Sequence, residues 1–303
     1  MTQQAPNSFR AASLPVLGAP QSVSDDFREA LLSAARTGLS KHPKRSSPRP
    51  SGSRFEHWAL LEVDEEAASL GTELLVDFLL GQCPAAALQA NLGARLVALN
   101  KKDGGIRPVA MGSVIRRLAA RAACKVLKES ITAAVGPNQY GVGRRAGCEL
   151  VHKLVTAHTD ADPTRVVLAF DASNAFGSMP RQQIWDAVLS RMPDLSPTLQ
   201  AWFRLQTTHV WWDRKGEAYP VHASAGVDQG CPLSPLLFAL GLAPALDEIS
   251  QRLSGSDASC HVMAYLDDVV VVAPARFAPD ALRIVSEAFN QAGLSLHENK
   301  TKT

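Results

Sequence analysis

Three aspartates lie beside or within apolar stretches of the chain, where a charged side chain is costly. Asp171 ends the run VVLAF, and Asp267 and Asp268 interrupt the run YLDDVVVV. Burying one carboxylate among valines is unfavourable, and burying two adjacent ones is worse. A tight hairpin would carry the adjacent pair at its tip, and a neighbouring buried strand that ends in an acid would bring the three carboxylates together.

Clustered carboxylates at strand ends suit hard divalent cations, which prefer charged oxygen ligands and keep waters for phosphate. Two Mg²⁺ ions about 3.5 to 4 Å apart can hold an attacking oxygen and a leaving pyrophosphate in line. Aspartate is also common in turns, where water solvates it. The residue types alone therefore leave two interpretations open, a two-metal site and unrelated turn acids.

The elements that must position these acids alternate between strands and helices, which predicts an α+β fold. Apolar strands are expected over Val166–Phe170, His261–Tyr265 and Val269–Ala273, and continuous apolar runs fit strands covered on both faces. A hairpin is expected from Arg95–Leu99 and Ile106–Met111, because the intervening KKDGG favours positive φ. Periodicity and capping residues predict helices over 24–39, 65–80, 113–130, 182–191, 196–206, 234–253 and 279–292, with extended chain over 210–225.

Composition limits the class of protein. The chain has 303 residues, of which 46% are hydrophobic and 20% charged, and a formal net charge of +2. These values exclude a wholly disordered, collagen-like or coiled-coil chain and allow one or two domains. No apolar run is long enough to span a membrane, and the polar N-terminus does not resemble a signal peptide. Five scattered cysteines suit a reducing compartment. We expect an intracellular protein with no membrane partner, without distinguishing nucleus from cytoplasm, and protein partners stay unknown.

Residues 1–54 are expected to form an N-terminal extension. Within it, Lys41–Arg54 (KHPKRSSPRPSGSR) has five Lys or Arg, no acid and many Pro and Ser, which predicts a flexible basic segment. The segment is either a solvated linker or a strand-contacting arm or localisation signal. From Phe55 the composition is that of a globular domain, which is expected to run over 55–303.

Several motifs together resemble those of reverse transcriptases. Tyr265-Leu266-Asp267-Asp268 is similar to the YxDD box, and DASNAF from Asp171 resembles motif A of that family. QGCPLSP from Gln229 resembles motif B, and the segment from Gly293 to Thr301 resembles motif D. Upstream, KKDG and RPV resemble the fingers hairpin and the "RPI" segment. The motifs follow the family's order over roughly 50–303, and the RPVAMGSVIRRLAARA and NQYGVG segments resemble non-LTR retroelement enzymes most.

The resemblance implies an RNA-directed DNA polymerase with right-hand architecture, fingers followed by a palm whose antiparallel sheet is flanked by helices. Its implied partners are an RNA template, a DNA primer and dNTP, and its cofactors are two Mg²⁺ ions with Mn²⁺ as a possible substitute. The resemblance assigns Asp171 and Asp267 as principal metal ligands, Asp268 as the adjacent carboxylate and the Ala172 carbonyl as a further ligand. Phosphoryl transfer depends mostly on positioning and charge neutralisation, which agrees with these assignments.

The resemblance also implies contacts to the incoming nucleotide. Phe176 would act as a steric gate against a ribose 2′-OH, an example of discrimination by exclusion; the alternative is a core aromatic. Gln229 and Gly230 would lie in a loop against the nucleotide, where glycine permits close approach; the alternative is an ordinary loop before a helix. Lys300 would donate a proton to pyrophosphate, or is simply a surface lysine.

Basic residues supply the remaining predicted contacts. The triphosphate would meet two lysines and the planar fork of an arginine, namely Lys101, Lys102 and Arg107. A phosphate backbone would follow one helical face that carries Arg117, Arg121, Lys125 and Lys128. The alternative for the second group is a solvated basic face.

The sequence departs from the family pattern at two places. Gly177 stands where many relatives have an acid, a position that is not a metal ligand. The chain ends at Thr303 directly after motif D, so the primer-grip hairpin and thumb are expected to be absent and the chain to be a fragment of a retroelement protein or a degenerate copy. Two further functions therefore stay open. One is a catalytically silent nucleic-acid-binding relic, and the other is a two-metal nuclease, which would not need Phe176 or the Gln229–Gly230 loop.

Overall fold

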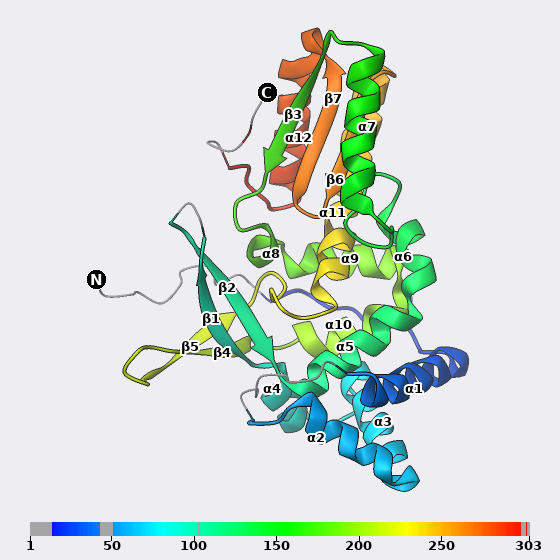
Figure 1. Cartoon of the computed structure of the whole chain (residues 1–303), viewed down its shortest axis with the longest axis vertical. Helices are drawn as coiled ribbons and strands as arrows, with labels where there is room; N and C mark the ends of the chain where they lie inside the picture. The colour runs from blue at the N-terminus through cyan, green and yellow to red at the C-terminus, as the bar shows by residue number, and fades with distance from the viewer. Residues whose placement is uncertain (1–13, 43–50, 102–103, 298–300, 302–303) are drawn as a thin grey trace. The chain divides into compact units, whose positions relative to one another are not determined.

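The computed structural model describes residues 14–42, 51–101, 104–297 and 301, and combines helices with two sheets (Figure 1). The described residues divide into two compact units. Unit 1 takes its residues from Met1–Leu127 and Pro193–Ser234, and unit 2 takes them from Lys128–Met192 and Pro235–Thr303. The predicted boundary after residue 54 therefore falls inside unit 1. Most of the predicted flexible basic segment lies outside the described residues.

The sheet of unit 1 has the strand order β2-β1-β4-β5. Its strands are β1 (Ala94–Asn100), β2 (Ile106–Gly112), β4 (Thr207–Trp212) and β5 (Ala218–Ala223). β1 and β2 form an antiparallel hairpin, as predicted, and the Lys101 N–H donates to the Gly105 carbonyl at its tip (2.7 Å). β1 runs parallel to β4. β4 and β5 form a second hairpin, which begins before the segment 210–225 that was predicted as extended and otherwise lies within it.

The helical part of unit 1 is built on α1 (Asp25–Ser40), α3 (Glu65–Leu80) and α5 (Val114–Val126), which pack on one another. A polar residue precedes each of these helices, and its side chain accepts a hydrogen bond from a backbone N–H of the first turn, as helix caps do. Because α1 packs into this core, the region predicted as an extension contributes to the fold. The shorter helices are α2 (Phe55–Ala59), η1 (Leu60–Val63), α4 (Ala85–Leu92), η2 (Pro193–Leu195) and α10 (Ser196–Phe203).

The helix predicted over 113–130 is wrong at its C-terminal end. α5 stops before Leu127, and a separate helix, α6 (Lys128–Val135), begins in unit 2. The two helices bury apolar residues in different units. Leu118 belongs to the core of unit 1 and Ile131 to that of unit 2.

The sheet of unit 2 is antiparallel throughout, with the order β3-β7-β6. Its strands are β3 (Arg165–Asp171), β6 (His261–Tyr265) and β7 (Asp268–Pro274), close to the predicted bounds. In Figure 1, α7 (Gly147–Ala161) crosses in front of this sheet and α12 (Ala278–Gln291) lies behind it, and both helices contact strands of the sheet. Cover on both faces explains the continuous valine run of β7. The predicted antiparallel sheet flanked by helices is present, whereas α7 was not predicted.

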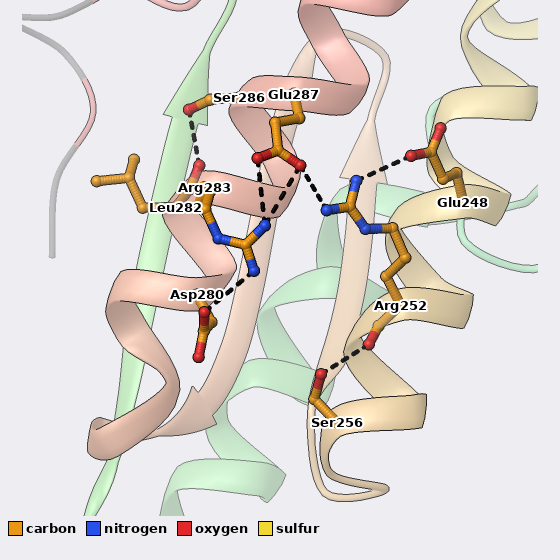
Figure 2. A network of polar contacts seen from close by, with 8 residues as sticks. All are labelled: Glu248, Arg252, Ser256, Asp280, Leu282, Arg283, Ser286 and Glu287. Carbon is orange, nitrogen blue, oxygen red and sulfur yellow. Dashed lines mark hydrogen bonds and ion pairs between the residues drawn. The ribbon is translucent and has the colours of Figure 1, made fainter.

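The remaining helices of unit 2 are α8 (Ala175–Ser178), α9 (Arg181–Arg191), η3 (Ala275–Phe277) and most of α11 (Ser234–Ser256). Figure 2 shows a polar network that joins α11 to α12. Arg252 of α11 contacts Glu248 one turn earlier and Glu287 of α12, and Glu287 also contacts Arg283, which pairs with Asp280. Hydrogen bonds from Arg252 and Arg283 lower the pKa of Glu287. Within the described ranges, no helix has the length and apolar character needed to cross a membrane.

Candidate active site

The predicted acids meet at one end of the unit 2 sheet. Asp171, the last residue of β3, lies opposite Asp268, the first residue of β7, and Asp268 lies opposite Tyr265, the last residue of β6. Side chains of directly opposed residues project from the same face of a sheet. Asp268 and Tyr265 are exposed, and Asp171 is half-buried. Two carboxylates and a phenol therefore form a row across the end of the three strands.

A two-residue turn, Leu266–Asp267, joins β6 to β7. Leu266 has a φ of +56°, the sign required at the first position of one of the tight turns that match the twist of paired strands. A leucine rarely adopts this conformation, because its Cβ crowds the backbone. Asp267 takes the second position and is half-buried. The predicted hairpin with an acidic tip is therefore present.

The motif D segment extends the sheet beyond Asp171. Ser173 N–H donates to the Ser295 carbonyl (2.8 Å), and His297 N–H donates to the Asp171 carbonyl (2.7 Å), with Ala172 opposite Leu296. On this side of the bridge, the two hydrogen bonds involve the carbonyl of Asp171 and the N–H of Ser173, the two neighbours of Ala172. The Ala172 carbonyl, a predicted metal ligand, therefore takes no part in this bridge. Lys300 lies outside the described residues.

The aspartate carboxylates at this end of the sheet fit a hard divalent cation whose other ligands are water and substrate phosphate oxygens. Among the described residues, no three side chains of His, Cys, Asp or Glu are grouped to hold a metal ion. The register places Asp171 opposite Asp268, and Asp267 lies in the turn directly before Asp268. The convergence of the Asp267 carboxylate with this pair stays a prediction. Mg²⁺ usually takes only one or two protein carboxylates and completes its shell with water and phosphate oxygens. Two opposed carboxylates repel each other, and a cation would relieve that repulsion.

Phe176, the predicted gate, lies on α8 and stacks on Phe238 of α11, with ring centroids 4.5 Å apart and an interplanar angle of 10°. Phe238 is fully buried, whereas Phe176 is half-buried. One face of the Phe176 ring thus packs on the core. A Cβ at Gly177, the position where relatives have an acid, would lie 2.8 Å from the Asn174 amide nitrogen, so a side chain there would displace that amide.

The motif B loop in unit 1 is fixed to β2. The Ala110 N–H donates to the Gln229 carbonyl (2.7 Å). Gly230 has a φ of +121°, and a Cβ built on it would lie 2.6 Å from the Ala110 carbonyl oxygen. Only glycine meets both demands, a positive φ and a close backbone approach. Gln229 is half-buried and Gly230 is exposed, so the loop presents backbone to solvent.

A buried ion network, not predicted from the sequence, holds the residue before Gln229. Asp228 accepts from Arg116 Nη1 (2.6 Å) and lies 3.0 Å from His209 Nε2, and Arg116 also donates to the Leu92 carbonyl (2.8 Å). Burial alone would raise the pKa of Asp228, but the charges of His209 and Arg116 outweigh it and hold that pKa well below its usual range. These partners come from α5 and β4, so no local pattern connects them.

The basic hairpin of unit 1 presents its charges to solvent. Lys101 at its tip and Arg107 on β2 are both exposed, which suits contact with an anionic ligand. Lys102 lies outside the described residues.

The predicted basic face of α5 is only partly as expected. The guanidinium groups of Arg117 and Arg121 lie 5.2 and 4.9 Å from the ring centre of the buried Phe55. Burial lowers the pKa of Arg121. Lys125, one turn further, is exposed. Lys128, which was predicted to share this face, begins the separate helix α6 in unit 2.

Comparisons with known proteins found a similar curated sequence, solved structures of similar fold and a matching family model. A curated relative, the "Retrotransposable element SLACS 132 kDa protein" of Trypanosoma brucei gambiense, is 26% identical over 214 residues, which cover 68% of this chain and 17% of that protein. The apo telomerase of Candida tropicalis, truncated from its C-terminal domain, has a similar fold, with a TM-score of 0.51 and 10% identity over 70% of this chain and 50% of that chain. A telomerase of Candida albicans, in complex with the TWJ fragment of telomeric RNA, gives a TM-score of 0.54 and 10% identity over 69% of this chain and 42% of that chain.

The chain thus spans only part of each of these proteins. The SLACS match supports the resemblance to non-LTR retroelement enzymes, and the telomerase matches show a shared fold. A family model described as reverse transcriptase (RNA-dependent DNA polymerase) matches residues 99–303. Enzymes of that family use divalent metal ions, in agreement with the oxygen donors at the end of the sheet. Because that match covers more than half of the sequence, the chain belongs to the reverse transcriptase family.

Proposed function

We propose that the chain catalyses DNA synthesis on an RNA template, in which the 3′-OH of a DNA primer attacks the α-phosphate of a dNTP and pyrophosphate leaves. The observation that carries the proposal is the register of unit 2. A motif A aspartate lies opposite the second aspartate of the YLDD turn, in a chain of this family. Phosphoryl transfer needs little covalent chemistry from the protein and much charge neutralisation, which paired carboxylates with bound cations provide.

In this proposal Asp171 and Asp267 are the principal ligands of two Mg²⁺ ions, with Mn²⁺ as a substitute. The Ala172 carbonyl is a further ligand, and Asp268 holds negative charge beside them. The ions, when bound, would bring the attacking and leaving oxygens into line and neutralise the developing charge. The chain's own part is to hold the carboxylates at the ends of paired strands, so that little reorganisation is needed during the reaction.

The contacts to nucleotide and nucleic acid are proposed from the motifs to which the residues belong. The triphosphate is assigned to Lys101, Lys102 and Arg107, and the pyrophosphate proton to Lys300. Gln229 and the exposed backbone of Gly230 are assigned to the nucleotide. The contact to the phosphate backbone of the template–primer is assigned to Lys125, which is exposed. Arg117 and Arg121 suit this contact less well, because they pack on Phe55.

Primer extension tests the proposal directly. The 303-residue chain is incubated with an RNA template, a 5′-labelled DNA primer, dNTPs and Mg²⁺ or Mn²⁺. We expect products lengthened by the templated nucleotides, and no extension when the complementary dNTP is withheld. Shortened labelled products would instead indicate a two-metal nuclease. Binding of the hybrid without extension, even with Mn²⁺, would indicate a silent nucleic-acid-binding protein.

Phe176→Val tests the proposed sugar gate. Truncation should open space beside the 2′ carbon, so we expect incorporation of rNTP relative to dNTP to rise by about tenfold or more, or roughly 1.4 kcal/mol per factor of ten. The measurement is single-nucleotide extension with matched dNTP and rNTP. The control is Phe289→Val, which removes a buried aromatic of α12.

The two roles of Phe176 predict different results. If its ring only packs on Phe238, Phe176→Val should lower the free energy of unfolding by about 1 to 3 kcal/mol and leave sugar selectivity unchanged. The Phe289→Val control should show that pattern. Unchanged selectivity in a folded, active Phe176→Val protein would reject the gate.

A further inference from the structure

Gln139 is a buried polar residue beside the acidic turn of unit 2. Its side chain is fully buried, and it lies in the NQYGVG segment that follows α6. The Tyr140 N–H donates to the Ala264 carbonyl (2.7 Å), and the Ala264 N–H donates to the Asn138 carbonyl (2.8 Å). This short parallel bridge fixes the segment along the free edge of β6, next to the residues that lead into the turn.

The Gln139 amide satisfies both backbone groups of Leu266. Its Oε1 accepts from the Leu266 N–H (2.8 Å) and from the Gly141 N–H (2.9 Å), and its Nε2 donates to the Leu266 carbonyl (3.3 Å). Leu266 is the turn residue with positive φ, a conformation that a leucine keeps only when its surroundings favour it. One side chain therefore fixes the strained residue directly before Asp267.

Gly141 also packs closely against Leu266. A Cβ built on Gly141 would lie 2.6 Å from the Leu266 backbone nitrogen and 2.7 Å from Leu266 Cγ. Only a residue without a side chain allows the segment to lie this close to the turn. The glutamine and the glycine, two residues apart, together surround Leu266.

We propose that Gln139 is a positioning residue that holds the Leu266–Asp267 turn in its positive-φ conformation, and so places Asp267 and Asp268 for metal binding and catalysis. The catalytic half of this inference rests on the proposed function. The conformational half does not, because it concerns the turn of the protein alone. Gln139 acts through the backbone of Leu266 and is not assigned any contact with substrate.

Hydrogen–deuterium exchange tests the conformational half. Gln139→Met keeps much of the side-chain volume and removes all three hydrogen bonds, so we expect amide exchange over 266–268 to become about tenfold faster. Exchange over 166–170 in β3 should stay as in the unsubstituted chain. The control is Gln182→Met, which removes an exposed amide that bonds Asp186. Unchanged exchange over 266–268 in Gln139→Met would overturn the proposal, and this measurement does not require polymerase activity.

Leu266→Gly separates positioning from simple packing. Glycine adopts positive φ without strain, so adding it to Gln139→Met should restore part of the lost activity. For Gln139→Met alone we expect kcat for single-nucleotide extension to fall about tenfold or more, with the KM for template–primer changed less than about twofold. Failure of Leu266→Gly to restore any activity would assign Gln139 to packing and reject positioning. If the unsubstituted chain does not extend primers, the proposed function fails and the exchange result still decides the role of Gln139.

Discussion

Substitution of Asp267 or Asp171 by asparagine is expected to reduce templated DNA synthesis by about a thousandfold or more, equivalent to roughly 4 kcal/mol of transition-state stabilisation. Asparagine is nearly isosteric with aspartate but lacks the negative charge that a divalent cation needs from its ligands. Asp171 is the last residue of β3 and lies opposite Asp268, and Asp267 lies in the turn between β6 and β7. The loss should therefore appear in extension by single nucleotides, whichever base is templated.

Three measurements show whether the substitutions affect the catalytic step itself, or instead affect nucleic-acid binding or folding. Binding of the RNA–DNA hybrid should be retained in both variants. Thermal stability should be retained or increased in Asp171→Asn, because the substitution removes repulsion between the opposed carboxylates of β3 and β7. Asp160→Asn, at an exposed position near the end of α7, should behave as the unsubstituted chain. Extension near the normal rate in Asp267→Asn would show that this carboxylate is not a metal ligand.

The parts of the fold and site that depend on residues close together in the sequence could be predicted. The valine run after Asp268 and the apolar run before Asp171 are strands because both faces of the sheet are covered, and their acids fall at strand ends. The KKDGG hairpin and the cap at Ser113 likewise follow from residues within a few positions of one another. Such features need no knowledge of the rest of the chain.

The rest of the site depends on contacts between distant segments. Gln139 contacts Leu266 across 127 positions, and Arg116 contacts Asp228 across 112. Neither pair leaves a periodic signal, because one polar residue in an apolar neighbourhood does not indicate its partner. The break at Leu127 is similar, since helical periodicity continues through it, and it coincides with the boundary between the two units.

The buried ion network gives the largest expected effect on stability. Asp228→Ala would leave Arg116, whose side chain is buried, without the carboxylate it contacts at 2.6 Å. Removing one partner of a buried ion pair typically costs about 3 to 5 kcal/mol, because the other charge stays buried. Asp228→Asn should cost less, since an amide oxygen still accepts from Arg116. Urea unfolding followed by tryptophan fluorescence is a suitable measurement, because the Arg116 guanidinium lies 5.2 Å from the ring centre of Trp202.

The same network predicts how stability depends on pH. Because His209 and Arg116 hold the pKa of Asp228 below the usual value in the folded chain, the ionised carboxylate stabilises the fold above its unfolded pKa of about 3.9. That contribution is lost as the pH falls below about 4 towards the lower folded value. The difference in unfolding free energy between the unsubstituted chain and Asp228→Ala should therefore be full at pH 7 and smaller at pH 3. Asp194→Ala, at an exposed position in the same unit, should change stability by less than about 0.5 kcal/mol at either pH. A difference below about 1 kcal/mol for Asp228→Ala at pH 7 would show that the network does not stabilise unit 1.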